Sequence, residues 1–154
     1  MSLWDWAVAA YAAPEVSDAC LALQDRHEQN VPLLLWAAWT AVAGRRPDEE
    51  TIEAACDVAR AWQETVIAPL RQMRRTLKTP LPDIEAAPRL EIRDQVKALE
   101  LKAERRLLEA LEALAPPPAG PPRPALDGLV ATARQWSSVT PRPALIRLAE
   151  ALPA

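Results

Sequence analysis

The most hydrophobic stretch of the chain is VPLLLWAAWTAV at residues 31–42, in which only Thr40 carries a polar side-chain group. It is too short to cross a bilayer, because a membrane-spanning helix needs about 20 apolar residues. Asn30 stands before it as a typical N-cap, and Gly44 follows it as a typical left-handed stop, so one helix is predicted over residues 31–43. A helix that is apolar on every side has to be covered on every side. We therefore predict a buried central helix surrounded by other helices.

Two short amphipathic helices are predicted ahead of this segment, over residues 3–12 and 14–28, because apolar residues recur there every three or four positions. Ser2 and Asp5 have the S-x-x-D form of a capping box at the start of the first helix. Pro14 ends the first helix and suits the first position of the second. Both helices are expected to pack against the central one.

A longer amphipathic helix is predicted over residues 49–78, where the apolar stripe runs from Ile52 to Leu77. Pro69 interrupts it, because the proline ring conflicts with the carbonyl group of Thr65 and removes one hydrogen bond. The apolar stripe continues past Pro69. We therefore expect one kinked helix rather than two unrelated helices.

Another long helix is predicted over residues 89–115, and it carries two apolar strips. The main strip, with a mean spacing of about 3.7 residues, is typical of a straight packed helix rather than of a heptad coiled coil. Leu90, Leu101 and Leu108 project to the opposite side and form the second strip. Its neighbour could be the C-terminal segment of the chain or another subunit, unless the leucines are simply isolated and exposed.

Proline dominates residues 116–124, PPPAGPPRP, which are predicted to be extended polyproline II. A semi-rigid linker is preferred over a proline-rich ligand for an adaptor domain. Two short amphipathic helices follow, and both are too short to be stable alone, so they must dock on the body of the domain or on a partner. The expected organisation is a helical domain over 1–115, the linker over 116–124 and a C-terminal helical segment over 125–154.

Composition supports an all-α fold, a compact multi-helix bundle around the central helix. The chain has 154 residues, which is enough for one domain, with 16 prolines and few β-branched runs. A net charge of −3 gives no reason to expect binding to nucleic acid or to an anionic membrane. The N-terminus, MSLWDW, lacks the basic region of a signal peptide, so a cytoplasmic protein without a transmembrane segment is expected.

The clearest charged feature is a basic face formed by Arg71, Arg74, Arg75 and Lys78, whose spacing of i, i+3, i+4 and i+7 places them on one side of a helix. Such a face could bind a phosphate, an anionic lipid headgroup, nucleic acid or an acidic partner. The preferred interpretation is a solvated face near a helix C-terminus, paired with acids of the next helix. An anionic ligand at this face remains the alternative.

His27 is the only histidine, and the carboxylates beside it make it a candidate general base or ligand. We prefer to place it in the charged C-terminus of a helix, since sequence neighbours on a helix do not face one another. Cys20 and Cys56 form no C-x-x-C motif, and no second His or Cys has metal-ligand spacing from His27. The chain also lacks a glycine-rich phosphate loop and a nucleophile elbow. No catalytic residue, metal or cofactor is predicted.

The runs LWDWAVAAYAAPEVSDACLALQDRHEQNVPLLLWAAW and WQETVIAPLRQMRRTLK resemble a family of small uncharacterised proteobacterial proteins, a domain of unknown function, over about residues 3–115. The resemblance implies an all-helical intracellular bacterial protein. It supplies no activity, cofactor or catalytic residue.

Two functions of different class remain. The preferred one is a non-enzymatic helical interaction or regulatory protein, which acts through a protein partner or self-association at the second apolar strip, the basic face or the C-terminal tail. The alternative is a small-molecule binding protein or an enzyme. Its pocket would be lined by Trp36, Trp39 and Trp62, with polar groups from His27 and Glu28.

Overall fold

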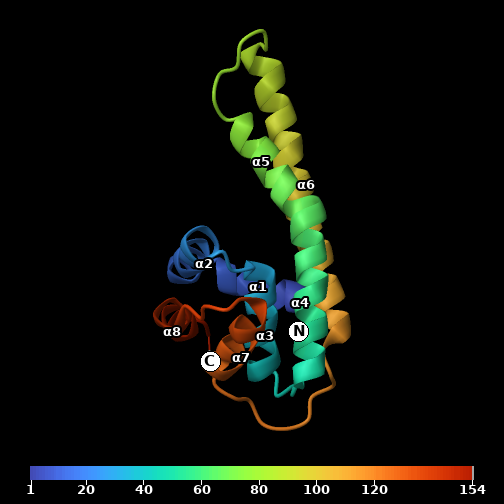
Figure 1. Cartoon of the computed structure of the whole chain (residues 1–154), viewed down its shortest axis with the longest axis vertical. Helices are drawn as coiled ribbons and strands as arrows, with labels where there is room; N and C mark the ends of the chain where they lie inside the picture. Colours follow the sequence, from blue (N-terminus) through green and yellow to red (C-terminus); the bar gives the residue numbers. More distant parts are fainter. Residues whose placement is uncertain (154) are drawn as a thin grey trace.

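The computed structural model describes residues 1–153, and this part of the chain contains helices and no β-strand, which confirms the all-α fold (Figure 1). The helices are α1 (Leu3–Tyr11), α2 (Pro14–His27), α3 (Val31–Val42), α4 (Glu49–Trp62), the π-helix η1 (Gln63–Ile67), α5 (Ala68–Thr76), α6 (Ala86–Leu114), α7 (Ala125–Trp136) and α8 (Arg142–Ala151). None of them is both long and apolar enough to cross a membrane.

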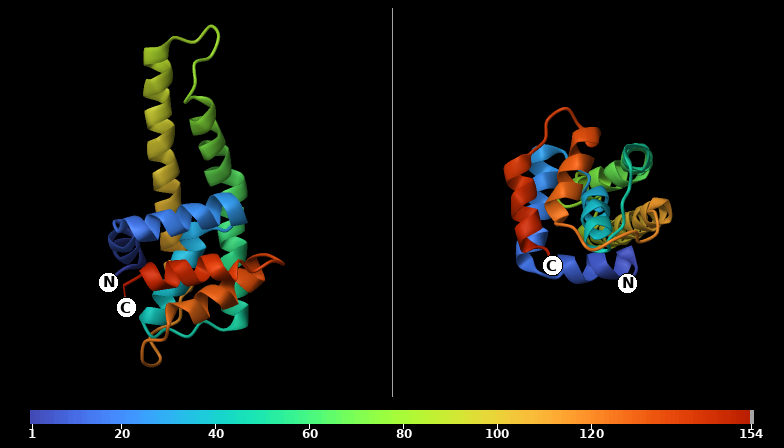
Figure 2. Two further views of the ribbon diagram at one scale, coloured as in Figure 1. Left: turned by 90° about the vertical axis from the view of Figure 1, so that its left-hand side faces the viewer. Right: turned by 90° about the horizontal axis from the view of Figure 1, so that it is seen from below.

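The molecule consists of a helical body and a projecting arm (Figures 1 and 2). The body contains α1, α2, α3, α7 and α8 together with the lower parts of α4 and α6. The arm is an antiparallel helical hairpin, in which α5 runs up and the first half of α6 runs down. We call it the hairpin; its tip is the segment 77–85.

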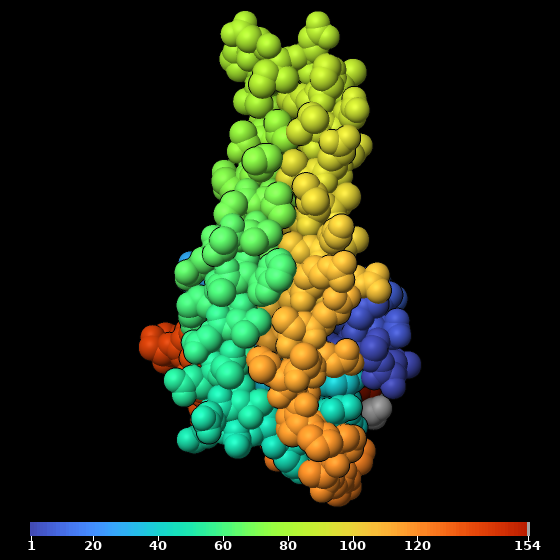
Figure 3. Space-filling model, turned by 90° about the vertical axis from the view of Figure 1, so that its right-hand side faces the viewer, coloured from blue at the N-terminus to red at the C-terminus, as the bar shows by residue number. Residues whose placement is uncertain are grey.

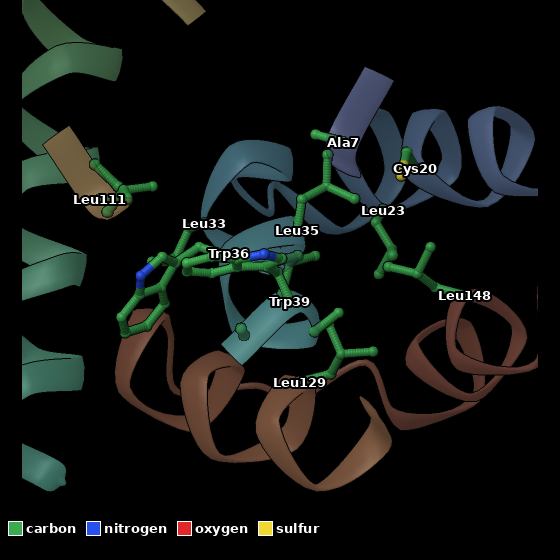
Figure 4. Close-up of a cluster of buried hydrophobic side chains, with 14 of the residues drawn as sticks. Ala7, Cys20, Leu23, Leu33, Leu35, Trp36, Trp39, Leu111, Leu129 and Leu148 are labelled. Atoms are coloured by element: carbon green, nitrogen blue, oxygen red, sulfur yellow. The ribbon is translucent and has the colours of Figure 1, made fainter. Parts of the chain in front are cut away.

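Helix α3 occupies the centre of the body, as predicted. Every residue from Leu33 to Ala41 is buried, and α1, α2, α4, α6 and α7 all pack against it (Figures 2 and 4). The Asn30 side chain accepts a hydrogen bond from the N–H of Leu33 at 2.9 Å, which confirms the N-cap. Gly44 follows the helix with φ of 70°, as expected of a left-handed stop.

The rod α4–η1–α5 continues past Pro69 without a break, so a single interrupted helix is observed (Figure 1). The interruption is a π-helical turn placed just before the proline. The N–H of Ala68 bonds to the carbonyl of Gln63, five residues back, instead of the usual four. This register change moves the chain away from the carbonyl with which the proline ring would collide in a regular α-helix.

The proline-rich segment lies against the C-terminal end of α3. Two N–H groups of the segment donate to carbonyls at the end of α3, where a helix leaves carbonyls without partners. In return, two arginines of the turn after α3 donate to carbonyls of the segment. The bonds are Ala119 N–H to Gly44 O at 2.9 Å, Arg123 N–H to Ala41 O at 2.9 Å, Arg45 Nη1 to Pro116 O at 2.8 Å and Arg46 Nη2 to Pro121 O at 2.7 Å. The segment is thus hydrogen-bonded to the body along its length.

The C-terminal helices dock on the body of their own chain. Helix α7 packs on α3 and helix α8 packs on α2, and Leu129 and Leu145 are completely buried there. Gly128 permits the close approach of α7, because a Cβ at this position would lie 2.7 Å from the carbonyl oxygen of Ala37. Helix α7 therefore supplies one of the covers that the all-apolar α3 requires.

Candidate functional site

A polar cleft of about 710 Å³ opens where the end of α2 meets the start of α3. Its other walls come from α4, η1, the α5–α6 pair and the loop between α7 and α8. Polar and charged side chains predominate among the lining residues. Largely polar surroundings of this size suit a small hydrophilic molecule better than an apolar one.

Trp136 holds one wall of the cleft in place. Its indole N–H donates to the backbone carbonyl of Glu28 at 3.0 Å. The guanidinium of Arg60 lies 4.2 Å from the centre of the indole ring and donates to the Trp136 carbonyl at 3.0 Å. These contacts connect α4, the end of α2 and the end of α7, so the wall is fixed by three elements that are distant in sequence.

Gln29 and Asn30 form the buried floor between α2 and α3, with exposed fractions of 3% and 4%. The amide nitrogen of Asn30 donates to Oε1 of Gln63 at 2.7 Å, which connects the start of α3 to the π-helical turn. The amide nitrogen of Gln29 donates to the His27 carbonyl at 3.2 Å. Gln29 Oε1 is buried and accepts no hydrogen bond from residues 1–153.

The predicted tryptophan-lined pocket does not assemble, and this prediction is corrected. His27 and Glu28 do line the cleft. Trp36 and Trp39 are 0% and 3% exposed, because α3 is covered on all sides and both indoles pack in the core (Figure 4). Trp62 lies on the rod, in a separate groove described below.

Trp136 is the aromatic residue of the cleft, and neither it nor Arg60 or Gln63 was predicted as a site residue from the sequence. In the sequence, the polar run before α3, residues 24–30, was the signal that pointed to this region. No local pattern could connect Trp136 to it, since 108 positions separate the indole from Glu28.

Neither cysteine is suited to nucleophilic chemistry. Burial raises the pKa of Cys20 to about 12 and that of Cys56 to about 11, so both thiols stay protonated at neutral pH. The described residues also contain no cluster of three or more His, Cys, Asp or Glu side chains that could hold a metal ion.

The four predicted basic residues do not form one free cationic surface. Arg74 and Arg71 turn toward α6, where Nε of each lies 2.9 and 3.6 Å from a carboxylate oxygen of Glu100. Arg75 lies 3.7 Å from Asp25 on the surface, and Lys78 is exposed. Arg71 and Arg74 thus pair with acids of the next helix, as the preferred interpretation expects, and two of the four charges are not available to a common anion site.

The second apolar strip is also divided by the structure. Leu90 and Leu101 are 44% and 58% exposed, but Leu108 is only 4% exposed and belongs to the core, which corrects its prediction as part of an outward strip. The reason is that α1 packs against the lower part of α6. The N–H of Leu3 donates to Glu112 there at 2.8 Å.

An apolar groove of about 470 Å³ lies at the base of the hairpin, between the rod α4–η1–α5 and α6, which run side by side in Figure 3. We call it the hairpin groove. Its lining residues are mostly apolar, with two cations from α6, and they are Trp62, Thr65, Val66, Pro69, Leu70, Leu99, Lys102, Ala103 and Arg106. Met73 and Ile92, higher on the hairpin, are about half exposed, at 50% and 48%.

These features define an all-α protein with a covered central helix, a polar cleft and a projecting hairpin. The chain belongs to the family described as "Protein of unknown function (DUF2390)", which matches residues 2–111. The match includes the hairpin, whereas α7 and α8 lie beyond the matched residues. No curated protein and no solved structure matches the chain.

Proposed function

We propose that this protein is a non-enzymatic, cytoplasmic interaction protein that binds an amphipathic helix of a partner protein in the hairpin groove. The observation that carries the proposal is the exposure of large apolar side chains on the hairpin, where Met73 and Ile92 are about half exposed although Val96 is buried. Leu99, in the groove, is 52% exposed. Large apolar side chains gathered on a projecting element are typical of interaction surfaces.

Polar contacts between the two helices of the hairpin support this interpretation. Helix α5 has no buried residue. Besides the Arg74–Glu100 ion pair, Arg89 donates to the Leu77 carbonyl at 2.7 Å and Arg93 donates to the Arg74 carbonyl at 3.3 Å. The two helices are therefore joined by charge-assisted hydrogen bonds, which leaves their apolar side chains free to contact a third helix.

The shape and charge of the groove specify the occupant. A groove between two antiparallel helices accepts a third helix, which places its apolar residues at i, i+3, i+4 and i+7 into the groove. The charged residues that line it are both cations, Lys102 and Arg106. Arg106 pairs with Glu109 at 2.8 Å, whereas Lys102 forms no ion pair with the described residues. The expected partner helix therefore carries acidic residues along one edge.

A peptide-binding experiment on the full chain tests the proposal. Two designed helical peptides would share the same leucine stripe, and one would carry glutamates and the other lysines along its edges. We expect fluorescence anisotropy to show saturable binding of the glutamate peptide only, weakened by salt. Leu99→Asp should weaken it at least about tenfold, the equivalent of roughly 1.4 kcal/mol.

Leu90→Asp is the matched control, because Leu90 is similarly exposed but does not line the groove. It should leave peptide binding unchanged. Equal binding of both peptides, or equal loss in both variants, would contradict the proposed occupant. A dimer in light scattering that dissociates in Leu99→Asp would instead identify a second copy of the chain as the occupant and overturn the proposal.

A further inference from the structure

We propose that the polar cleft is a binding site for a small organic anion that also carries a hydrogen-bond donor, as hydroxy acids and sugar phosphates do. This site is separate from the hairpin groove. The two have no lining residue in common, although α4, η1, α5 and α6 contribute different residues to each. The proposal therefore does not depend on the proposed function.

The charged side chains of the cleft that form no ion pair within residues 1–153 carry a net positive charge. Two of its carboxylates already have partners, since Asp25 lies 3.7 Å from Arg75 and Glu104 lies 3.7 Å from Arg71. Glu28 is the remaining acid in the lining.

Against this single acid stand two arginines of the lining that form no ion pair with described residues. Arg26 makes no side-chain hydrogen bond to residues 1–153, and Arg60 donates only to the backbone carbonyl of Trp136. The first turn of α3 also borders the cleft, and the N-terminus of a helix carries partial positive charge. Together these groups favour a carboxylate or phosphate.

Gln29 supplies the second half of the recognition. This residue lines the cleft and is only 3% exposed. Its Oε1 accepts no hydrogen bond from the described residues. Buried carbonyl oxygens in folded proteins nearly always accept a hydrogen bond. A hydroxyl or amino group on the bound anion would provide the missing donor, and an anion without such a group would not.

The walls are already in position for binding. Hydrogen bonds from Asn30 to Gln63 and from Trp136 to Glu28 hold the floor and one side. The π-helical turn forms another part of the lining, and single π-turns occur frequently at functional sites because they reposition side chains within a helix. Little ordering would therefore accompany binding.

Titration of the full chain by ¹⁵N NMR and calorimetry tests the inference with glycerol 3-phosphate, malate, inorganic phosphate and glycerol. We expect saturable shifts of the Trp136 indole and the Gln29 side-chain amide with glycerol 3-phosphate or malate, in the millimolar range or tighter. Tighter binding of glycerol 3-phosphate would indicate a phosphate ligand, and tighter binding of malate would indicate a carboxylate. Phosphate should bind more weakly, and glycerol should not bind.

Two variants and a control complete the experiment. Arg26→Gln should weaken binding about tenfold, as expected for one lost charge-assisted interaction. Gln29→Met should reduce the affinity for glycerol 3-phosphate to that for phosphate. Arg147→Gln removes the same charge from an exposed position outside the cleft and should change nothing.

Three results would overturn the assignment. The first is the absence of saturable shifts at Trp136 and Gln29 with every probe. The second is equal weakening by Arg26→Gln and Arg147→Gln, which would indicate only the general charge of the molecule. The third is phosphate binding as tight as that of glycerol 3-phosphate. Arg26→Gln is informative even if Gln29→Met folds poorly, because Arg26 is exposed and makes no side-chain hydrogen bond within residues 1–153.

Discussion

Arg74 donates to both carboxylate oxygens of Glu100, with Nε 2.9 Å from Oε2 and Nη2 3.2 Å from Oε1. The Glu100 side chain is only 9% exposed, and Nε of Arg71 approaches the same carboxylate to 3.6 Å. One shielded carboxylate thus connects two arginines of the rod to α6. Since α5 contributes no buried residue, this group is a principal link between the two helices of the hairpin.

Glu100→Gln should destabilise the protein. The substitution removes the charge that compensates Arg71 and Arg74, whose side chains are only 18% and 24% exposed. Breaking a fully buried pair costs about 3–5 kcal/mol, and partial exposure of the arginines reduces the expected loss to about 1–3 kcal/mol. Urea unfolding measures the free energy, and hydrogen exchange should show faster opening of α5 than of α3.

Glu109→Gln is the control for this prediction. Glu109 pairs with Arg105 and Arg106 on the surface of the same helix. Exposed ion pairs contribute little to stability, because water and salt screen the two charges. A loss in Glu109→Gln as large as that in Glu100→Gln would show that the ion pairs inside the hairpin have no special role.

Substitution of Glu104 should have the opposite effect on stability to substitution of Glu100, although the two residues lie one turn apart on the same helix. Burial and the neighbouring Glu100 raise its pKa above 4.5, and the opposing effect of Arg71 is smaller. A carboxyl group whose pKa is raised in the folded state contributes stability below its unfolded pKa and loses that contribution as pH rises through the folded value.

Glu104→Gln therefore removes a cost that the ionised wild-type side chain imposes. The free energy of unfolding of the variant, relative to the wild type, should rise as pH increases from about 4.5 toward neutrality. Urea midpoints measured across this range provide the comparison. A variant that becomes less stable than the wild type near neutral pH would show that the ion pair with Arg71 outweighs the burial of the carboxylate.

Gly44→Ala should destabilise the turn that joins α3 to the proline-rich segment. Gly44 has φ of 70°, a conformation that costs other residues about 1–2 kcal/mol. A Cβ there would also collide with the backbone carbonyl of Gly120. The expected loss is about 2 kcal/mol or more.

Gly120→Ala is the control at the other glycine of this contact. A Cβ on Gly120 would meet only the flexible end of Arg46, at 2.9 Å from Nη2, and Gly120 does not have positive φ. This variant should lie within about 0.5 kcal/mol of the wild type. If both substitutions cost the same, the left-handed conformation of Gly44 is not what makes the position restrictive.

Leu129→Ala examines whether α7 is part of the cooperative core. Leu129 is completely buried between α7 and the body, so its truncation should cost about 2–5 kcal/mol. Tryptophan fluorescence and circular dichroism should still report one coincident transition. Leu101→Ala, at a position 58% exposed, should change the free energy of unfolding by less than about 0.5 kcal/mol. A small effect at Leu129 would mean that α7 unfolds separately from α3.

Local sequence signals predicted the helices well. The Asn30 cap, the Gly44 stop and the Pro14 start each act within a few residues, and all three lie where the pattern placed them. The burial of α3 also followed from its composition, because an all-apolar helix has to be covered.

Features that depend on distant partners could not be predicted. Leu108 was assigned outward from helical geometry alone, and its burial results from α1, which lies far away in sequence. Leu99 belongs to the main apolar strip of the same helix, which the periodicity predicts to be packed, yet it is 52% exposed because only one helix faces α6 in the hairpin. The cleft likewise needs Trp136 beside Glu28, a contact that no periodicity reveals.

Pro69 lies inside a continuous rod, just after the π-helical turn. A proline within a regular helix costs about 3 kcal/mol. If the π-helical turn already accommodates the proline ring, Pro69→Ala should change the free energy of unfolding by less than about 1 kcal/mol. The bond between Asn30 and Gln63 depends on this turn, so the side-chain amide resonances of Asn30 should also stay in place.

Pro143→Ala is the matched control, because Pro143 occupies the first turn of α8, where a missing N–H costs nothing. Both substitutions should therefore have similarly small effects in urea unfolding. Stabilisation of about 3 kcal/mol by Pro69→Ala alone would mean that the proline is strained and that the π-helical turn does not relieve it. Displacement of the Asn30 amide resonances would then indicate that the proline, rather than the packing of α3, sets the register of the rod at the cleft.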